Sequence, residues 1–251
     1  MQEKVKQNSL DSSFLRKDLL TQENALTSDY VSFDLRIAEK RGDIIRCQYF
    51  IAEIYNKRYN IFFSNEKYDL NAKVEPYPDY YIMACVDSKI VGCVGMYLKN
   101  TYIKKYGNVS NEDIDKIIKE ANLSEFYSSE YVREVTKLVI DPKFSKTGLG
   151  ALLIQAAYSK FFLNQGDQTA AYAVVFCGTL SSVKLHEPAQ VSTRRIREFP
   201  FYSVHDKYRS SKDPMESHIV FPKQDIPKEV RDIAIPGTFV LPMIKRKGLG
   251  V

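Results

Sequence analysis

The chain has 251 residues, of which 44% are hydrophobic and 27% charged, and its formal net charge is +5 at pH 7. This is ordinary globular composition, and the length allows one elaborated domain or a domain with an appendage. The basic residues are scattered apart from clusters at 194–197 and 245–247, which argues against a nucleic-acid-binding protein. There is no stretch of about 18 apolar residues and no signal-peptide core, so we expect a cytoplasmic protein without an integral membrane segment.

The cysteines exclude two further classes of protein. Cys47, Cys85, Cys93 and Cys177 show no Cys-x-x-Cys spacing, and three of them lie in apolar stretches. We expect reduced thiols in the core, with neither a disulfide framework nor a metal site.

The first quarter of the chain predicts an arm, a strand and a helix. Residues 1–29 are polar, which indicates a loosely docked arm. Apolar and polar residues alternate over 30–38, as in a half-buried strand. Over 44–59 the apolar residues recur every three or four positions, the spacing of an amphipathic helix. Residues 60–78 contain Asn, Asp and two prolines, so we expect an irregular loop.

The next segment predicts a hairpin and a short helix. Two β-rich runs, 79–86 and 89–98, flank a polar two-residue turn. A helix over 111–122 is capped by Ser110 or Asn111.

The second half begins with an alternation of strands and helices. Residues 131–140 form a strand, 148–164 a helix, and 170–177 a buried strand with almost no polar residue. Helical character follows over 179–187, until Pro188.

The last sixty residues show weaker patterns. Short β-like pieces occur at 199–204 and 217–221, and the final stretch contains too many prolines for a regular element. The order of elements in the whole chain indicates an α/β layer architecture.

The joint between the strand at 131–140 and the following helix is the most informative segment. The strand ends at Asp141-Pro142, and the helix begins at Gly148-Leu149-Gly150. Glycines allow close approach to the backbone, and unpaired N–H groups at a helix start attract a phosphate. Lys143 and Lys146 add positive charge. A tight turn between two core elements is the alternative interpretation.

This joint resembles the acyl-coenzyme-A-binding motif of the GNAT acyltransferase superfamily, Val-x-Pro-x-Tyr-Arg-x-x-Gly-x-Gly. Ser145 replaces the usual Arg or Gln. The resemblance is strongest over 131–164 and extends weakly over about 31–190. It implies an α/β GNAT fold, with a mixed, mostly antiparallel sheet flanked by helices and a C-terminal extension. The residues in register with the motif are Ile140, Pro142, Phe144, Gly148 and Gly150.

The resemblance also implies a donor-binding site. The donor is acyl-CoA or acyl carrier protein, bound as a co-substrate without a metal. The residues implied to bind it are Leu138, Val139, Ile140, Lys146, Thr147, Gly148, Leu149 and Gly150.

Glu134 is the first catalytic candidate. Strand alternation predicts that it shares a face with Val132, Leu138 and Ile140, where a carboxylate on an apolar face would have a raised pKa and suit an amine proton. GNAT enzymes with a glutamate base on this strand place it eleven residues before the loop Arg or Gln, and Glu134 has this spacing from Ser145. The alternative is a structural salt bridge to a neighbouring basic residue.

Residues 134–137 resemble the Glu-x-x-Arg of acyl-homoserine-lactone synthases, with Lys137 in place of Arg. Those enzymes and the related N-acyl amino acid synthases are GNAT-fold proteins that move long acyl chains onto amino-acid-derived amines. Further matches are Arg46, Asp69, the strand at 79–82 and Val91-Gly92. The resemblance implies that Arg46, Asp69 and Lys137 bind substrate.

His186 is the second catalytic candidate. Many GNAT enzymes follow the buried strand with Asn-x-x-Ala-x-x-Leu-Tyr, whose Tyr protonates the departing thiolate. Thr179, Ser182, Leu185 and His186 have this spacing, and a histidine can act as an acid near neutral pH. A surface histidine without a role is the alternative. We interpret Cys177 as a buried thiol rather than a nucleophile.

Together these features predict an N-acyltransferase that acts on an amino acid or small amine. An ordinary acetyl-CoA-dependent N-acetyltransferase and a non-catalytic GNAT-fold binding protein remain alternatives. We expect an arm at 1–29, a core at 30–190, and an extension at 191–251 that completes the sheet and the substrate side. Arginines at 194, 195 and 197 are candidates for an acceptor carboxylate or for a solvated face.

Overall fold

A computed structural model describes residues 30–59, 78–99, 109–162, 172–178, 180–198, 216–222 and 232–243. The predicted arm at 1–29, the β-like piece at 199–204 and the substrate-binding candidate Asp69 lie outside these described residues.

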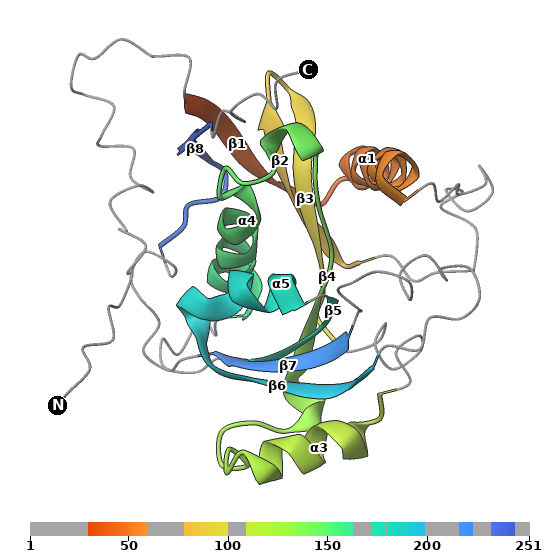
Figure 1. Ribbon diagram of the computed structural model, residues 1–251, viewed down its shortest axis with the longest axis vertical. Helices are drawn as coiled ribbons and strands as arrows, with labels where there is room; N and C mark the ends of the chain where they lie inside the picture. Colours follow the sequence, from red (N-terminus) through yellow and green to blue (C-terminus); the bar gives the residue numbers. More distant parts are fainter. Residues whose placement is uncertain are drawn as a thin grey trace, which may run out of the picture.

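Within the described residues, eight strands form one open sheet in the order β6-β7-β5-β4-β3-β2-β1-β8 (Figure 1). Neighbours run antiparallel except β4 and β5, which are parallel. The predicted mixed, mostly antiparallel sheet is therefore confirmed. The strands are β1 (Tyr30–Ala38), β2 (Tyr80–Val86), β3 (Lys89–Tyr97), β4 (Val132–Ile140), β5 (Ala173–Gly178), β6 (Gln190–Glu198), β7 (Glu216–Pro222) and β8 (Gly237–Pro242).

Helices cover both faces of this sheet. On one side, here called the α1 face, lie α1 (Arg41–Tyr59) and α3 (Asn111–Glu120), and on the other, the α4 face, lie α4 (Leu149–Ala157) and α5 (Leu180–Val183) (Figure 1). A π-helical turn (Tyr158–Phe162) continues α4, and a 3-10 turn (Lys184–Ala189) follows α5. Because side chains alternate along a strand, each strand contributes to both layers of core.

Local signals explain two of these elements. Asp87 and Ser88, between β2 and β3, both have positive φ, 47° and 65°, as the favoured two-residue hairpin turn requires. At the start of α3, Ser110 Oγ accepts from the Asp113 N–H, and Asp113 accepts in return from the Ser110 N–H. This capping box satisfies two N–H groups at the helix start and confirms the predicted Ser110 cap.

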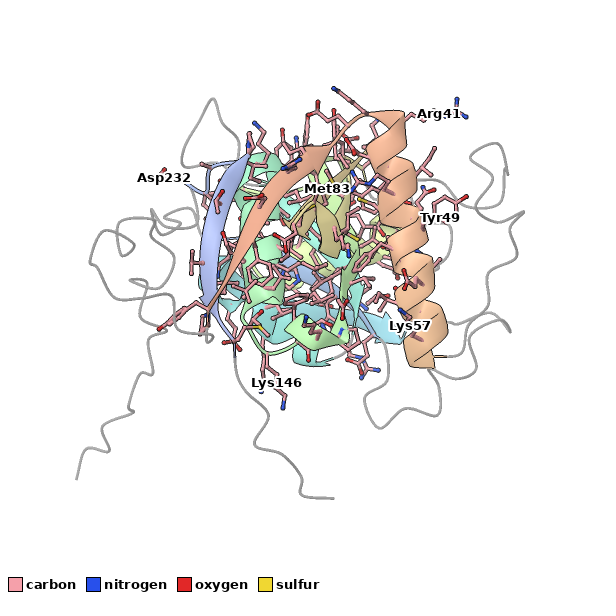
Figure 2. All side chains as sticks on the ribbon, turned by 90° about the horizontal axis from the view of Figure 1, so that it is seen from above. Arg41, Tyr49, Lys57, Met83, Lys146 and Asp232 are labelled. Atoms are coloured by element: carbon pink, nitrogen blue, oxygen red, sulfur yellow. The ribbon has the colours of Figure 1, made fainter. Side chains whose placement is uncertain are left out.

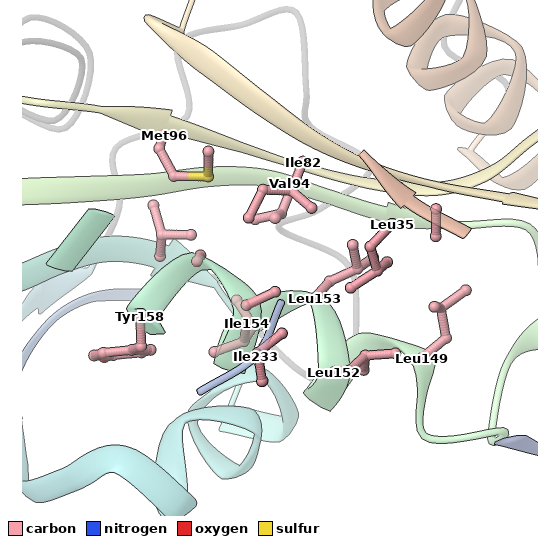
Figure 3. Packing of buried hydrophobic residues seen from close by; sticks show 14 of the residues in the cluster. Leu35, Ile82, Val94, Met96, Leu149, Leu152, Leu153, Ile154, Tyr158 and Ile233 are labelled. Atoms are coloured by element: carbon pink, nitrogen blue, oxygen red, sulfur yellow. The ribbon is translucent and has the colours of Figure 1, made fainter. Parts of the chain in front are cut away.

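The larger part of the core lies beneath α4. This helix buries eight of its nine residues, because it lies between the sheet and the α5 segment. Figure 3 shows Leu153 directed toward the strands, near Leu35, and Ile154 on the other side of the helix beside Ile233. Because α4 is closely packed, the position of the glycine loop at the start of this helix is fixed.

The C-terminal region corrects one prediction. We expected no regular element there, but β8 pairs antiparallel with β1 and extends the sheet. Thr238 Oγ1 donates to Asp34 Oδ1 at 2.8 Å across this pair. The prolines are compatible with it because Pro236 precedes the strand and Pro242 ends it, where a missing N–H interrupts no central ladder. The charged strand β6 was not predicted either.

Cys47, Cys85 and Cys93 are buried free thiols. Within the described ranges, no helix is long and apolar enough to cross a membrane. In the same ranges, no group of three or more His, Cys, Asp or Glu side chains could hold a metal ion.

Candidate active site

The parallel strands β4 and β5 separate in the middle of the sheet. Their pairing covers residues 132–135 of β4 and 173–176 of β5 and, within the described residues, goes no further. Both strands nevertheless continue, β4 to Ile140 beside β3 and β5 to Gly178 beside β7. The edge of β4 beyond Val135 therefore offers backbone N–H and C=O groups to something other than β5. We call this opening the fork.

A β-bulge lies in β4 at the fork. Cys93 and Gly95 of β3 are partners of Val139 and Thr136, so β4 uses one residue more than β3 over this step. Lys137, which lies in this step, has a φ of +52°, in the left-handed region, and we assign it as the extra residue of the bulge. A bulge of one residue exchanges the faces to which the side chains after it point.

The bulge corrects part of the predicted face of Glu134, which lies on the same face as Val132, as predicted, but not on that of Leu138 and Ile140. Its partners Tyr97 on β3 and Val175 on β5 place it on the α1 face, whereas Leu138 and Ile140 pack with the α4-face core. Strand alternation counted straight through Lys137 gave the wrong answer because it assumed a regular strand. Glu134 is 1% exposed, so the carboxyl is shielded from bulk water beside the fork.

The glycine loop lies at the other end of the same strand. Thr147 Oγ1 donates to the Phe144 carbonyl at 2.8 Å and lies 3.3 Å from the Leu149 nitrogen at the start of α4. Gly148 has a φ of +90°, and a Cβ built on it meets no atom within 4 Å. A Cβ on Gly150 would lie 3.0 Å from the Ile140 side chain. Gly148 thus leaves open space at the helix start, and Gly150 allows α4 to rest on β4.

Two lysine side chains of the segment between β4 and α4 carry positive charge at the surface. Lys143 and Lys146 are both exposed, and Figure 2 shows the Lys146 side chain pointing away from the body of the protein. Lys146 has a φ of +73°, so its backbone forms part of the sharp turn before Gly148. The combination of a helix start, open space and two lysines suits an anionic group.

His186 is buried on the α4 face, so the alternative of a surface histidine is wrong. Its ring is 2% exposed and stacks on Phe176, the last β5 residue paired with β4, with centroids 4.3 Å apart. The Tyr158 hydroxyl lies 3.0 Å from Nδ1. Burial, with a smaller effect of His218, lowers the pKa of His186 to about 3. The ring is therefore neutral near pH 7 and provides no imidazolium acid.

Two further residues of this buried group were not predicted. His218 of β7 stacks on Phe176 at 5.4 Å, and Glu216 lies 3.4 Å from its Nε2 and 3.2 Å from Arg195. Burial lowers the pKa of His218, Glu216 raises it, and Arg195 lowers it. The polar residues 216–218 in an otherwise apolar strand could have indicated this buried polar group from the sequence.

The predicted substrate-binding residues do not gather at one point. Lys137 forms the bulge, but the Arg46 guanidinium lies 3.2 Å from Asp43 and donates to the Ser88 carbonyl at 2.9 Å, at the hairpin turn. Arg195 is paired with Glu216, and Arg194 is exposed. Of the candidates among the described residues, only Lys137 lies on the strand that carries Glu134.

Comparison with known proteins agrees with this geometry. The sequence matches the Acetyltransferase (GNAT) family over residues 48–188, more than half of the chain; this segment begins within α1 and contains the fork and the glycine loop. The chain belongs to the GNAT acetyltransferase family. This GNAT protein is therefore an acyltransferase, as predicted. None of the curated proteins matches its sequence.

Solved structures similar to this GNAT protein include two lactone synthases. The CoA-dependent acyl-homoserine lactone synthase BjaI, with SAM and isopentyl-CoA, is 13% identical over 80% of this chain and 87% of that chain, with a TM-score of 0.48. The AHL synthase LasI is 13% identical over 79% and 92%, with a TM-score of 0.44. ElaA of Escherichia coli is 7% identical over 74% and 98%, with a TM-score of 0.44.

Proposed function

We propose that this protein transfers an acyl group from a phosphopantetheine thioester to the amine of an amino acid or small amine. The donor is acyl-CoA or acyl carrier protein. The observation that carries this proposal is the fork, because it connects the glycine loop at one end of β4 with a buried carboxyl on the same strand. An extended donor that starts at the loop and follows β4 brings its thioester toward Glu134.

The donor would use groups that the fold leaves available. N–H groups at residues 146–150 would hold the pyrophosphate, in the space beside Gly148, with Lys146 nearby. The pantetheine amides would pair with the edge of β4 at Leu138, Val139 and Ile140, as an added strand does. This arrangement is supported by the end of β4–β5 pairing at Val135.

Glu134 would be the base. It takes a proton from the acceptor ammonium, directly or through water, and the neutral amine then attacks the thioester carbonyl. The C–N bond forms, the C–S bond breaks, and the thiolate leaves with a proton. The 1% exposure of Glu134 supports this role, because a base works best where bulk water does not compete.

His186 would assist on the other face. If Tyr158 donates to Nδ1, the neutral ring carries its proton on Nε2 and can donate a hydrogen bond to the departing sulfur. This differs from the imidazolium acid that we expected from the sequence. The stacking of His186 on Phe176 keeps the ring next to the fork.

We also propose that 30–190 is the catalytic core and that 191–251 is an extension of it. The pairing of β7 with β5 and of β8 with β1 supports an extension that is built into the sheet.

The proposal is tested by thiol release and product mass spectrometry. The purified protein is incubated with acyl-CoAs from acetyl to palmitoyl, and with the matching acyl carrier proteins, in the presence of the twenty amino acids. We expect thiol release that depends on the amino acid, and the matching N-acyl amino acid in the mass spectrum. Activity with acetyl-CoA alone would indicate an ordinary acetyltransferase, and binding of acyl-CoA without turnover would indicate a non-catalytic GNAT domain.

A further inference from the structure

Tyr158 and His186 form a buried polar pair inside the apolar core of the α4 face. Both side chains are buried, and the phenol oxygen lies 3.0 Å from Nδ1 of the imidazole. The two residues are 28 positions apart, at the end of α4 and in the 3-10 turn after α5. A hydrogen bond at this depth strongly constrains the ring, because it cannot be exchanged for a hydrogen bond to water.

The end of α4 brings the phenol to this place. Tyr158 is the C-terminal cap of α4 and the first residue of the π-helical turn that continues to Phe162. A π-helical turn is wider than an α-helical one, is rare in proteins, and often occurs at functional sites. The irregular end of α4 therefore requires a reason, and its first side chain is the one that contacts His186.

Two ring contacts fix the orientation of the imidazole. Its plane makes an angle of 13° with the Phe176 ring, at a centroid distance of 4.3 Å, and an angle of 82° with the Tyr158 ring, at 5.7 Å. In the described residues, Phe176 is the last β5 residue that pairs with β4. The imidazole therefore lies on the residue at which the fork opens, with Nδ1 toward the phenol and Nε2 at another edge of the ring.

The chemistry of the two groups decides which of them donates. Burial is the main cause that lowers the pKa of His186 to about 3, and burial also raises the pKa of Tyr158, so the ring is neutral and the phenol keeps its proton. A neutral imidazole has one donor nitrogen and one acceptor nitrogen. The phenol is the stronger donor of the pair and the unprotonated ring nitrogen the stronger acceptor, so the O–H donates to Nδ1. The proton of the ring is then on Nε2.

We propose that Tyr158 is the positioning residue of His186: its hydroxyl donates to Nδ1 and keeps the ring proton on Nε2, where it serves the departing sulfur. This inference rests on the proposed function and deepens it, because it names the group that decides which ring nitrogen donates. Tyr158 itself contacts none of the reacting atoms. With the proton on Nδ1 instead, Nε2 would present a lone pair and would repel a thiolate.

The first test reads the position of the proton directly and does not depend on turnover. In the full-length protein with ¹⁵N-labelled histidine, nitrogen chemical shifts distinguish a protonated from an unprotonated ring nitrogen. The chain has three histidines, which are assigned by replacing them one at a time. Near neutral pH we expect a protonated Nε2 and an unprotonated Nδ1 at His186. A protonated Nδ1 would overturn the inference.

A matched pair of variants tests the contact itself. Tyr158→Phe removes the hydroxyl and keeps the ring that packs in the core, and we expect the Nδ1 resonance of His186 to move because this nitrogen loses its O–H donor. Tyr81→Phe makes the same change at a buried phenol on the α1 face and should leave the His186 resonances in place. An unmoved Nδ1 resonance in Tyr158→Phe contradicts the proposed contact.

A double-mutant cycle separates positioning from a merely structural role. Tyr158→Phe should lower kcat about tenfold, the effect of one hydrogen bond lost in the transition state, and leave donor affinity unchanged. In a His186→Phe background the same change should have no further effect on kcat, because Tyr158 acts through the ring. Equal losses of kcat in the two backgrounds would overturn the inference. Failure of the proposed function is distinguishable, since it would appear as an Nε2-protonated His186 in a protein that releases no thiol from acyl donors.

Discussion

The two faces of the sheet differ most where β4 and β5 separate. On the α4 face Tyr158 and His186 form a neutral pair within the large apolar core, and His218 and Glu216 of β7 lie on the other side of Phe176. On the α1 face the polar groups include the buried carboxyl of Glu134 and the buried side-chain amide of Gln48. The glycine loop, where the donor would bind, lies at the start of α4, the helix that covers the α4 face.

This difference suggests a division of work. Acyl transfer needs a base for the incoming amine and a proton or hydrogen bond for the outgoing thiolate, and the two would neutralise each other if they were in contact. Placement on opposite faces of one fork keeps them apart, because Glu134 lies on β4 and His186 stacks on Phe176 of β5. Four changes test that division, in order of expected effect.

Glu134→Gln should have the largest effect, since it removes the base of the α1 face. A positioned base contributes about a hundred- to ten-thousandfold in rate. We expect kcat to fall by that factor, donor affinity to stay unchanged, and the acidic limb of the pH–rate profile to disappear. Steady-state kinetics across pH measure all three. Near-normal kcat with the same limb would place the base elsewhere.

The bulge should be sensitive to the backbone preference of residue 137. Lys137 has a φ of +52°, which valine adopts poorly and glycine adopts freely. Lys137→Val should lose about 1–3 kcal/mol of unfolding free energy relative to Lys137→Gly, as is typical of a strained residue. Both variants lack the ammonium, so any larger loss of kcat in the valine variant reports on the alignment of Glu134. Denaturant unfolding and kinetics provide the comparison, and equal values would show that the bulge is unimportant.

The donor loop should respond to negative charge at Gly148. Its φ of +90° strains most side chains, but Asn and Asp enter the left-handed region more readily than others. Gly148→Asp should bind acyl-CoA about tenfold more weakly than Gly148→Asn, which is about 1.4 kcal/mol. Calorimetry with an acyl-CoA measures the difference. Equal affinities of these two similar variants would move the pyrophosphate away from this helix start.

The neutral pair of the α4 face should appear in the pH dependence of stability. His186 has a pKa of about 3 in the folded protein, so below about 6.5 the unfolded chain binds more protons than the native state and stability falls as pH decreases. Between pH 6.5 and 5.5 this residue costs about 1 kcal/mol. His186→Phe should flatten that slope in denaturant unfolding, although loss of the Tyr158 contact lowers stability at pH 7.5 by about 1 kcal/mol. An unchanged slope would contradict the assigned pKa.

Much of the molecule could be predicted from local sequence. The alternation over 30–38, the polar hairpin turn, the Ser110 cap and the Gly-x-Gly joint all act through neighbouring residues, and each appears where expected. Glu134 and His186 could be selected as candidates because their spacing from the loop and the buried strand is also local. The strand β8 escaped prediction because its stability comes from β1, more than two hundred residues away.

Only the tertiary structure decided how these residues meet. The face of Glu134 depends on whether one residue, Lys137, is paired or left over against β3, and a single-residue difference reverses every side chain beyond it. The burial that holds His186 neutral comes from Phe176 and Tyr158 on separate elements. Sequence determines which groups are present and which turns form, because those depend on short-range sterics. Register and burial depend on contacts between distant segments, so the site became defined only when the sheet was assembled.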